Sequence, residues 1–253
     1  MRQTAVPSPA TLELSTHRLW LRAYSPEMAL PFWRLLQENR SRLLTDFPDR
    51  TAAVQTLEDA AHRIRTMTYQ RRAGDLYSLG IFRKDTEDYI GDVTLRRLAR
   101  GKLYAEVGYY LSGAAEGQGY ATEALKAVLK YAFQVLRMES VSLRCAKANT
   151  RSQKVAERTG FTLTRTYTPT VTDSGGEPRE LCCYSFQRND FALQLLWRTC
   201  FLENRPKTPE PVSMDLSGCK TLIKRNCLHT FPAVLLRGSK TASAEPFAGT
   251  FSR

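Results

Sequence analysis

No stretch of the sequence approaches the roughly 18 consecutive apolar residues that a membrane-spanning helix needs. The opening residues, MRQTAVPSPATLEL, also lack the apolar segment of a signal peptide. The chain has three histidines, and its six cysteines form no C-x-x-C pair, so neither a zinc site nor a disulfide framework is indicated. We therefore expect a cytoplasmic protein with reduced thiols, no bound metal and no membrane partner.

Two common phosphate-binding loops are missing as well. A P-loop requires Gly-Lys followed by Ser or Thr, and the chain has no such triplet. A dinucleotide-binding fingerprint requires a third glycine three residues after the second, but Thr122 occupies that place behind Gly117 and Gly119. Any phosphate-binding loop in this chain must therefore be of another kind.

The net charge of +12 raises the question of a nucleic-acid partner. The excess is spread out, with +8 over residues 1–189 and +4 over residues 190–253. The densest basic patch, RLARGK (97–102), is explained more simply as a solvated turn between strands. Direct binding to nucleic acid is therefore not expected, whereas a phosphorylated cofactor would benefit from this charge.

The hydrophobic periodicity of the first half predicts a strand, two helices and an antiparallel meander of three strands. Ser25 is the expected N-cap of the first helix, with Pro26 at its first position. Thr56 and Asp59 form the expected capping box of the second helix, which runs to about Arg72. The four strands are expected at 12–24, 77–82, 89–98 and 104–111.

The second half begins with an amphipathic helix whose apolar positions are Ala124, Leu125, Val128, Leu129, Ala132, Phe133 and Leu136. A further helix is expected from Asn149, as its cap, to Gly160, as its glycine stop. Strands are predicted at 139–147, 161–167 and 180–186, the last two joined by a loop with Asp173, Ser174, Gly175 and Gly176.

These elements add up to one α+β domain of about seven strands and four helices over residues 11–189. Residues 1–10 are expected to be a flexible N-terminus. Residues 190–253 are expected to be an extension that is dispensable for chemistry, with one short helix over 191–202 followed by flexible segments rich in Pro, Ser and Gly.

The stretch EGQGYA (116–121) combines two glycines with the start of the amphipathic helix. The first N–H groups of a helix lack intrahelical partners, and the positive end of the helix dipole lies there. Glycine lets a ligand approach the backbone closely. The stretch therefore suits an anion such as phosphate, although an ordinary helix start in which glycine only turns the chain is the plainer alternative.

The ordered set of motifs resembles the GNAT family of N-acetyltransferases over about residues 11–188. The family's pyrophosphate loop is usually Q/R-x-x-G-x-G/A, and here Glu116, Gly119 and Ala121 stand at the marked places. THRLWLR (16–22) and AEVGYYL (105–111) are similar to strands of the branch that contains ribosomal-protein-alanine N-acetyltransferases. The helix motif Asn-x-x-Ser, ending in Gly-Phe, is matched by Asn149, Ser152, Gly160 and Phe161.

The resemblance implies a mixed, largely antiparallel, twisted sheet that opens between its fourth and fifth strands to admit acetyl-CoA. The pantetheine arm is expected to pair with the backbone of Tyr109 and Leu111. The expected diphosphate-binding residues are Glu116, Gly117, Gln118, Gly119, Tyr120 and Ala121, and Asn149 and Ser152 complete the cofactor site. Glu116 departs from the pattern, which has Gln or Arg at this place. Its carboxylate would repel a diphosphate unless the side chain points away.

Direct attack of an amine on the thioester, which the resemblance implies, requires a base and help for the leaving thiolate. Glu106 is the candidate base and Asp92 a weaker one, although a plain surface carboxylate explains Glu106 equally well. The tyrosine that many members place seven residues after the helix asparagine is replaced by Ala156. In the branch named above, the serine three residues after that asparagine serves the thiol, so the resemblance implies this role for Ser152; a hydroxyl that satisfies the first turn of the helix is the plainer alternative.

Deprotonating an α-amine at pH 7 costs about 1 kcal/mol, against about 4.6 kcal/mol for a lysine side chain. Together with the branch resemblance, this favours a protein or peptide N-terminal α-amine as the acceptor. Two other functions stay open: acetylation of a small-molecule amine (aminoglycoside, polyamine or amino acid), and a non-catalytic acyl-CoA-binding or RNA-associated module. The sequence also leaves open whether the protein is a monomer or a homodimer.

Overall fold

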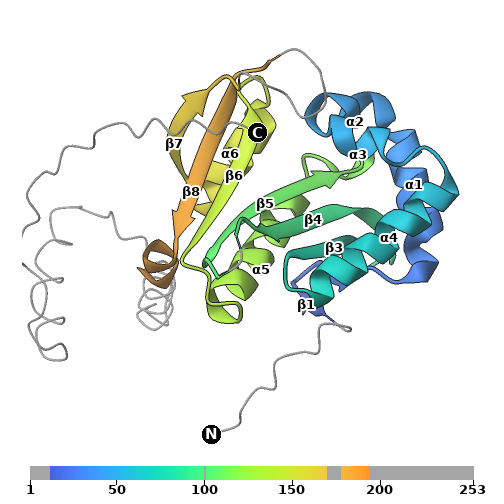
Figure 1. The fold of residues 1–253 in the computed structure, drawn as a ribbon, viewed down its shortest axis with the longest axis horizontal. Coiled ribbons are helices and arrows are strands. Elements are labelled where there is room, and N and C mark those ends of the chain that lie inside the picture. The colour runs from blue at the N-terminus through green and yellow to red at the C-terminus, as the bar shows by residue number, and fades with distance from the viewer. Residues whose placement is uncertain (1–11, 100, 170–177, 194–253) are drawn as a thin grey trace, which may run out of the picture. The chain divides into compact units, whose positions relative to one another are not determined.

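A computed structural model describes residues 12–99, 101–169 and 178–193. Its strands form one mixed, mostly antiparallel sheet in the order β1-β2-β3-β4-β5-β6-β8-β7 (Figure 1). The strands are β1 (Glu13–Ser15), β2 (Leu19–Ala23), β3 (Leu76–Arg83), β4 (Tyr89–Arg97), β5 (Tyr104–Leu111), β6 (Ser140–Ala146), β7 (Thr162–Tyr167) and β8 (Leu181–Gln187). The α+β fold with an open twisted sheet is thus confirmed. Among the described residues, no helix is both long and apolar enough to cross a bilayer.

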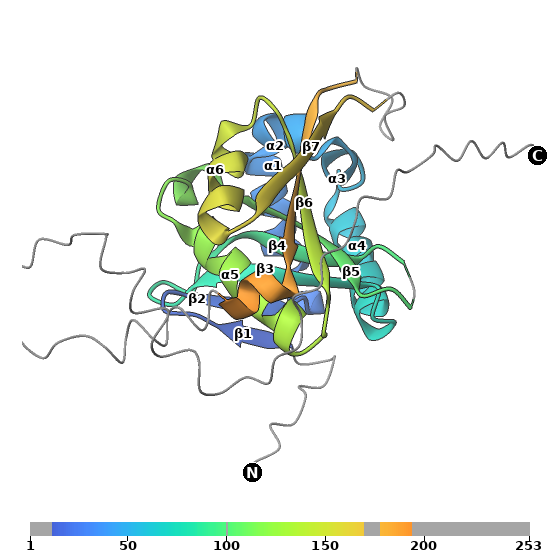
Figure 2. The same ribbon diagram turned by 90° about the vertical axis from the view of Figure 1, so that its left-hand side faces the viewer.

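Helices cover both faces of the sheet, with α5 and α6 on one face and α1 to α4 on the other (Figures 1 and 2). The helices are α1 (Ala29–Glu38), α2 (Arg40–Asp46), α3 (Pro48–Ala52), α4 (Leu57–Arg72), α5 (Tyr120–Gln134) and α6 (Thr150–Thr159), with short 3-10 turns at Pro26–Met28 (η2) and Gly113–Ala115 (η3).

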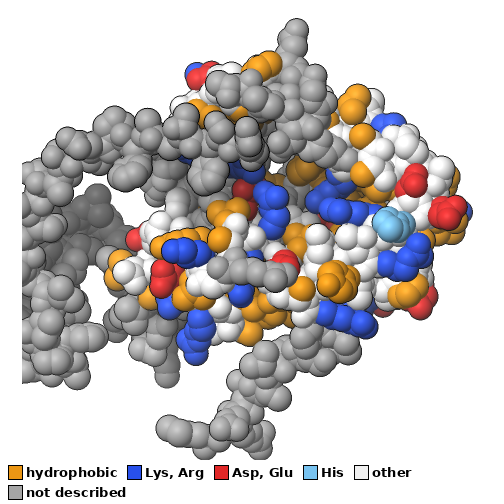
Figure 3. Space-filling view, viewed as in Figure 1, with side chains coloured by type: hydrophobic (Ala, Val, Ile, Leu, Met, Phe, Trp, Pro, Cys, Tyr) orange, Lys and Arg blue, Asp and Glu red, His pale blue; other side chains and the backbone are white. Residues whose placement is uncertain are grey.

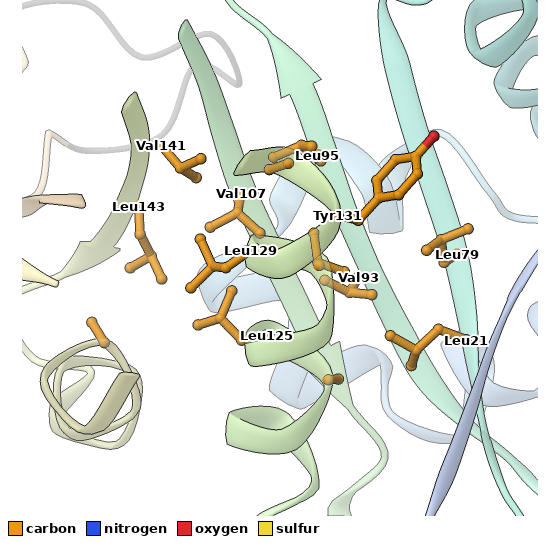
Figure 4. Packing of buried hydrophobic residues seen from close by; sticks show 14 of the residues in the cluster. Leu21, Leu79, Val93, Leu95, Val107, Leu125, Leu129, Tyr131, Val141 and Leu143 are labelled. Atoms are coloured by element: carbon orange, nitrogen blue, oxygen red, sulfur yellow. The ribbon is translucent and has the colours of Figure 1, made fainter. Parts of the chain in front are cut away.

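The larger core lies between α5 and the sheet. The apolar positions predicted for this helix are buried, except Leu136, which lies beyond the end of α5 and is partly buried. Leu125 and Leu129 pack against strand residues such as Val107 and Leu143 (Figure 4). This burial fixes α5, and with it the glycine loop at its N-terminus, against the strands.

The sheet opens between β5 and β6, as predicted. The two parallel strands are paired from Tyr104 with Ser140 to Val107 with Leu143, but β5 continues to Leu111 and β6 to Ala146. Beyond Val107 the β6-facing edge of β5 therefore has no strand partner, which leaves backbone donors and acceptors for a ligand.

Two predictions at the N-terminal end were wrong in detail. The single strand expected over 12–24 is a hairpin of β1 and β2, because Thr16 turns the chain through bonds with Leu19, and the sheet gains an eighth strand. Ser25 and Pro26 do stand at the N-cap and first position, but those of the η2 turn; the Ser25 hydroxyl makes no cap hydrogen bond, and α1 begins only at Ala29.

Other local predictions are confirmed. Thr56 and Asp59 make both hydrogen bonds of a capping box at the start of α4. Asn149 caps α6, and Gly160 ends it in the left-handed conformation. Cys145, Cys182 and Cys183 are buried free thiols. The loop at 173–176 and the residues beyond 193 lie outside the described ranges.

Candidate active site

The glycine loop before α5 is open and its backbone is accessible. Gly117 and Gly119 both have positive φ, 76° and 81°, which glycine adopts without steric cost. A Cβ added at Gly117 would meet nothing within 4 Å, and one at Gly119 only the Arg18 guanidinium, at 3.5 Å. Gly119 is the N-cap of α5 and no side chain caps the helix there. The loop thus has the free space and the backbone donors that a diphosphate group requires.

Two side chains that the sequence analysis did not single out hold this loop in place. Glu123, in the first turn of α5, accepts hydrogen bonds from the Arg18 backbone N–H (2.7 Å), from Arg18 Nε (2.8 Å) and from Thr16 Oγ1 (2.7 Å). Arg18 in turn donates to the Gln118 carbonyl at 3.0 Å and lies over the Tyr120 ring. The partners are about a hundred residues apart in sequence, so no local pattern indicates them.

Glu116, the unusual residue of the loop, is paired with two arginines. Arg42 of α2 contacts one carboxylate oxygen, and Arg151 of α6 lies 2.6 Å from the other. Arg42 also donates to the Leu111 carbonyl at 2.8 Å. The loop, the end of β5 and the start of α6 are therefore joined through Glu116 and Arg42.

The backbone hydrogen bonds of β5 show which residues direct their backbone groups toward the opening. Ser112 donates to the Ile90 carbonyl on β4, so Leu111, one residue earlier, directs its backbone groups to the opposite side. Tyr109 is two residues before Leu111 and directs its backbone groups the same way. The structure therefore places both predicted pantetheine-binding residues with their backbones toward the opening.

Asn149, Ser152 and Tyr109 meet on the other side of the opening. The Asn149 side chain accepts from the Ser152 N–H at 3.0 Å and donates to Asp46 at 2.8 Å. The Tyr109 hydroxyl lies 3.0 Å from Ser152 Oγ. Burial raises the pKa of Tyr109 to about 12 and that of the nearby Cys145 thiol to about 11, so both groups are protonated near neutral pH.

Glu106 lies on the face of β5 opposite to the Tyr109 side chain, which is the face toward α1 to α4. Its carboxylate receives two hydrogen bonds from Arg144 on β6, at 3.0 and 3.1 Å, and Arg96 on β4 is 3.6 Å away. The side chain is 19% exposed, so water reaches it. Neither arginine was predicted from the sequence.

Asp92, the weaker base candidate, is almost fully buried. It is paired with Arg50 at 3.0 Å and accepts a hydrogen bond from Tyr24 at 2.7 Å. Burial and then the Asp92 charge raise the pKa of the Tyr24 phenol. The contacts engage both carboxylate oxygens and tie α3 to the sheet.

The N-terminus of α5 thus presents an open glycine loop beside a sheet edge that has no strand partner, an arrangement suited to a phosphorylated cofactor. Among the described residues, no group of three or more His, Cys, Asp or Glu side chains could hold a metal ion. A family model described as an acetyltransferase (GNAT) domain matches residues 18–162. The chain belongs to this family, and its domain is that of an acetyl-CoA-dependent N-acetyltransferase.

Among similar proteins, the chain is 34% identical over 107 residues to the probable N-acetyltransferase YjcK of Bacillus subtilis; the match covers 42% of this chain and 59% of that protein. It is 28% identical over 147 residues to the ribosomal-protein-serine acetyltransferase of Escherichia coli, over 57% of this chain and 79% of that protein.

Solved structures show the same fold. RimL, a ribosomal L7/L12 α-N-protein acetyltransferase solved with coenzyme A, superposes with a TM-score of 0.64 at 20% identity, over 70% of this chain and 98% of that one. RimJ of Mycobacterium smegmatis, solved with a CoA disulfide, gives 0.66 at 17% identity, over 76% and 96%.

Proposed function

We propose that the protein acetylates the N-terminal α-amine of a protein or peptide. The observation that carries the choice of acceptor is the charge of the sheet face that bears Glu106. Both base candidates there are matched or outnumbered by arginine: Glu106 contacts Arg144 and Arg96, while Asp92 pairs with Arg50. Lys and Arg side chains gather near the middle of this face, with acidic ones beside them (Figure 3).

A face of this charge disfavours polycationic acceptors. An aminoglycoside or polyamine would bring several ammonium groups toward arginines, and like charges brought together repel. A peptide N-terminus carries one ammonium group, and its carbonyl oxygens can accept hydrogen bonds from guanidinium groups. The relatives named as ribosomal-protein acetyltransferases support a protein acceptor and, with it, the cytoplasmic location that we propose.

Acetyl-CoA supplies the acetyl group as an activated thioester. The backbone amides of residues 117–121 would bind its diphosphate, whereas the Glu116 N–H donates to the Gly113 carbonyl. The edge of β5 at Tyr109 and Leu111 would orient its pantetheine arm. Ser152, whose N–H is fixed by Asn149, would hold a proton near the sulfur. Glu106 would take up the amine proton through water, and since two guanidinium groups engage this carboxylate, an amine that loses its proton at low cost suits the site best.

Thiol release from acetyl-CoA across a panel of acceptors tests the proposal. The panel contains a peptide with a free α-amine and no lysine, the same peptide with a blocked N-terminus and one added lysine, spermidine, and an aminoglycoside. We expect turnover with the free α-amine only. Release with spermidine or the aminoglycoside alone would favour a small-molecule enzyme, and binding without release on any acceptor would favour a non-catalytic module.

Glu106→Gln separates the proposed base from cofactor binding. The substitution keeps the size of the side chain and removes the proton acceptor, so turnover should fall while affinity for CoA is unchanged. Full turnover in this variant would show that Glu106 is a surface carboxylate without a catalytic role.

A further inference from the structure

Glu116 puts a negative charge in the loop that is expected to hold a diphosphate. An unpaired carboxylate at this place would repel phosphate and weaken binding. The side chain is not unpaired, however, because each of its oxygens contacts a guanidinium group. The effect of Glu116 on phosphate binding therefore depends on these two arginines.

The arginines approach the loop from different elements. Arg42 lies on α2 and Arg151 in the first turn of α6, and Glu116 between them accepts from an Nη1 atom of each. The side chain of Arg151 is 82% exposed and that of Arg42 is 38% exposed. Both guanidinium groups are thus accessible to a ligand that enters the loop.

A guanidinium group has five N–H donors. Arg42 donates to Glu116 and to the Leu111 carbonyl, and Arg151 donates to Glu116, so each retains further donors for a ligand. Its planar set of donors matches phosphate oxygens, and such charge-assisted bonds are among the stronger ones in proteins. An exposed arginine loses rotamer freedom when it binds a ligand. Glu116 reduces that loss because it already holds both side chains at the loop.

We propose that Arg42 and Arg151 bind phosphate groups of coenzyme A and that Glu116 is the positioning residue that holds them there. The inference rests on the use of acetyl-CoA by this site. The diphosphate and the 3′-phosphate of coenzyme A present the same chemistry to an arginine, so the ligands of the test are chosen to separate them.

Calorimetry of the purified protein with CoA gives the direct measurement. Arg151→Ala and Arg42→Ala should each weaken binding on the order of tenfold. Glu116→Gln should weaken it by a smaller factor, because the amide no longer attracts both guanidinium groups. Arg158→Ala, which removes an exposed arginine from the last turn of the same helix, is the matched control and should bind as wild type does.

Glu116→Gln alone separates the two views of this residue. Tighter CoA binding in this variant would mean that the carboxylate repels the ligand, and it would overturn the proposal. Added to Arg151→Ala, the same substitution should have a reduced effect, because one of the groups through which Glu116 acts is gone. In turnover assays the KM for acetyl-CoA should rise in these variants while kcat stays the same.

Dephospho-CoA and pantetheine identify the phosphate. If Arg151→Ala weakens CoA but binds dephospho-CoA as wild type does, Arg151 binds the 3′-phosphate; if it weakens both, it binds the diphosphate. Pantetheine should bind equally to all variants. Wild-type affinity for CoA in both arginine variants would overturn the inference alone, whereas absence of CoA binding by the wild-type protein would contradict the cofactor assignment itself.

Discussion

The Tyr109 hydroxyl lies 3.0 Å from Ser152 Oγ, and this hydrogen bond joins β5 to the first turn of α6 beside the opening of the sheet. The position on α6 where many relatives are expected to carry a tyrosine is the buried Ala156. Here Tyr109 of β5, and not a residue of α6, brings a phenol to Ser152. This hydrogen bond orients the Ser152 hydroxyl, which we propose to lie near the thiol of the cofactor.

Tyr109 and Ser152 are predicted to act together in the chemical step. Tyr109→Phe removes one hydrogen bond to Ser152 without changing the ring, so kcat should fall about three- to tenfold while the Kd for CoA stays the same. Ser152→Ala should lower kcat at least as much. The double variant should be no slower than Ser152→Ala, because the two residues act as a unit. Unchanged kcat in Tyr109→Phe would show that the pair has no part in the chemistry.

Tyr109 should also affect stability at alkaline pH. Burial raises its pKa from the ordinary value near 10 to about 12, so the folded state favours the protonated phenol. The resulting stabilisation, on the order of 2 kcal/mol, is complete below pH 10 and is lost as the pH rises to about 12. The free energy of unfolding should therefore fall less steeply between pH 10 and 12 in Tyr109→Phe than in wild type. Parallel curves would contradict the assignment.

Asp92 is predicted to be a structural residue whatever its part in catalysis. Asp92→Asn leaves the Arg50 guanidinium without its buried counter-charge and should cost about 3–5 kcal/mol of unfolding free energy. Glu13→Gln, which breaks the exposed pair with Arg22, should cost less than about 1 kcal/mol. Denaturant titration of both variants measures the difference, and equal costs would argue against this role.

Gly91 allows β4 and β5 to approach each other next to the opening. A Cβ at this position would lie 2.2 Å from the Tyr110 carbonyl oxygen and 2.8 Å from Leu111 Cδ2. Gly91→Ala should therefore destabilise the fold by at least about 2 kcal/mol. Gly108→Ala, whose Cβ would meet only Thr94 Oγ1 at 3.4 Å, is the matched control for thermal denaturation. A wild-type melting temperature in Gly91→Ala would contradict the described strand packing.

The parts of the fold that could be predicted from sequence are those with a short-range signal. The capping box of Thr56 and Asp59, the Asn149 cap and the Gly160 stop involve residues at most four apart or a single special backbone conformation. The Thr16 turn was missed because residues 15–18 (Ser, Thr, His and Arg) include no glycine, proline or asparagine to mark a turn.

The site was predicted less completely, for a physical reason. The glycine loop and the edge of β5 follow from backbone geometry, which local motifs indicate. The arginines that surround Glu116 and Glu106 are brought there by tertiary packing; Arg42 is 74 residues from Glu116, and Arg144 is 38 residues from Glu106. An odd residue at a motif position, as Glu116 is, was the one sequence signal that pointed to such partners.

The central claim is that backbone donors at the start of α5 bind the diphosphate of coenzyme A. Gly119 has a φ of 81° at the N-cap of α5, and a β-branched side chain is strained there and fills the open loop. The most direct measurement is calorimetry of Gly119→Val and wild type with CoA, each shown by circular dichroism to be folded. We expect binding to wild type and no detectable heat from Gly119→Val; equal affinity of the two proteins would contradict diphosphate binding at this loop.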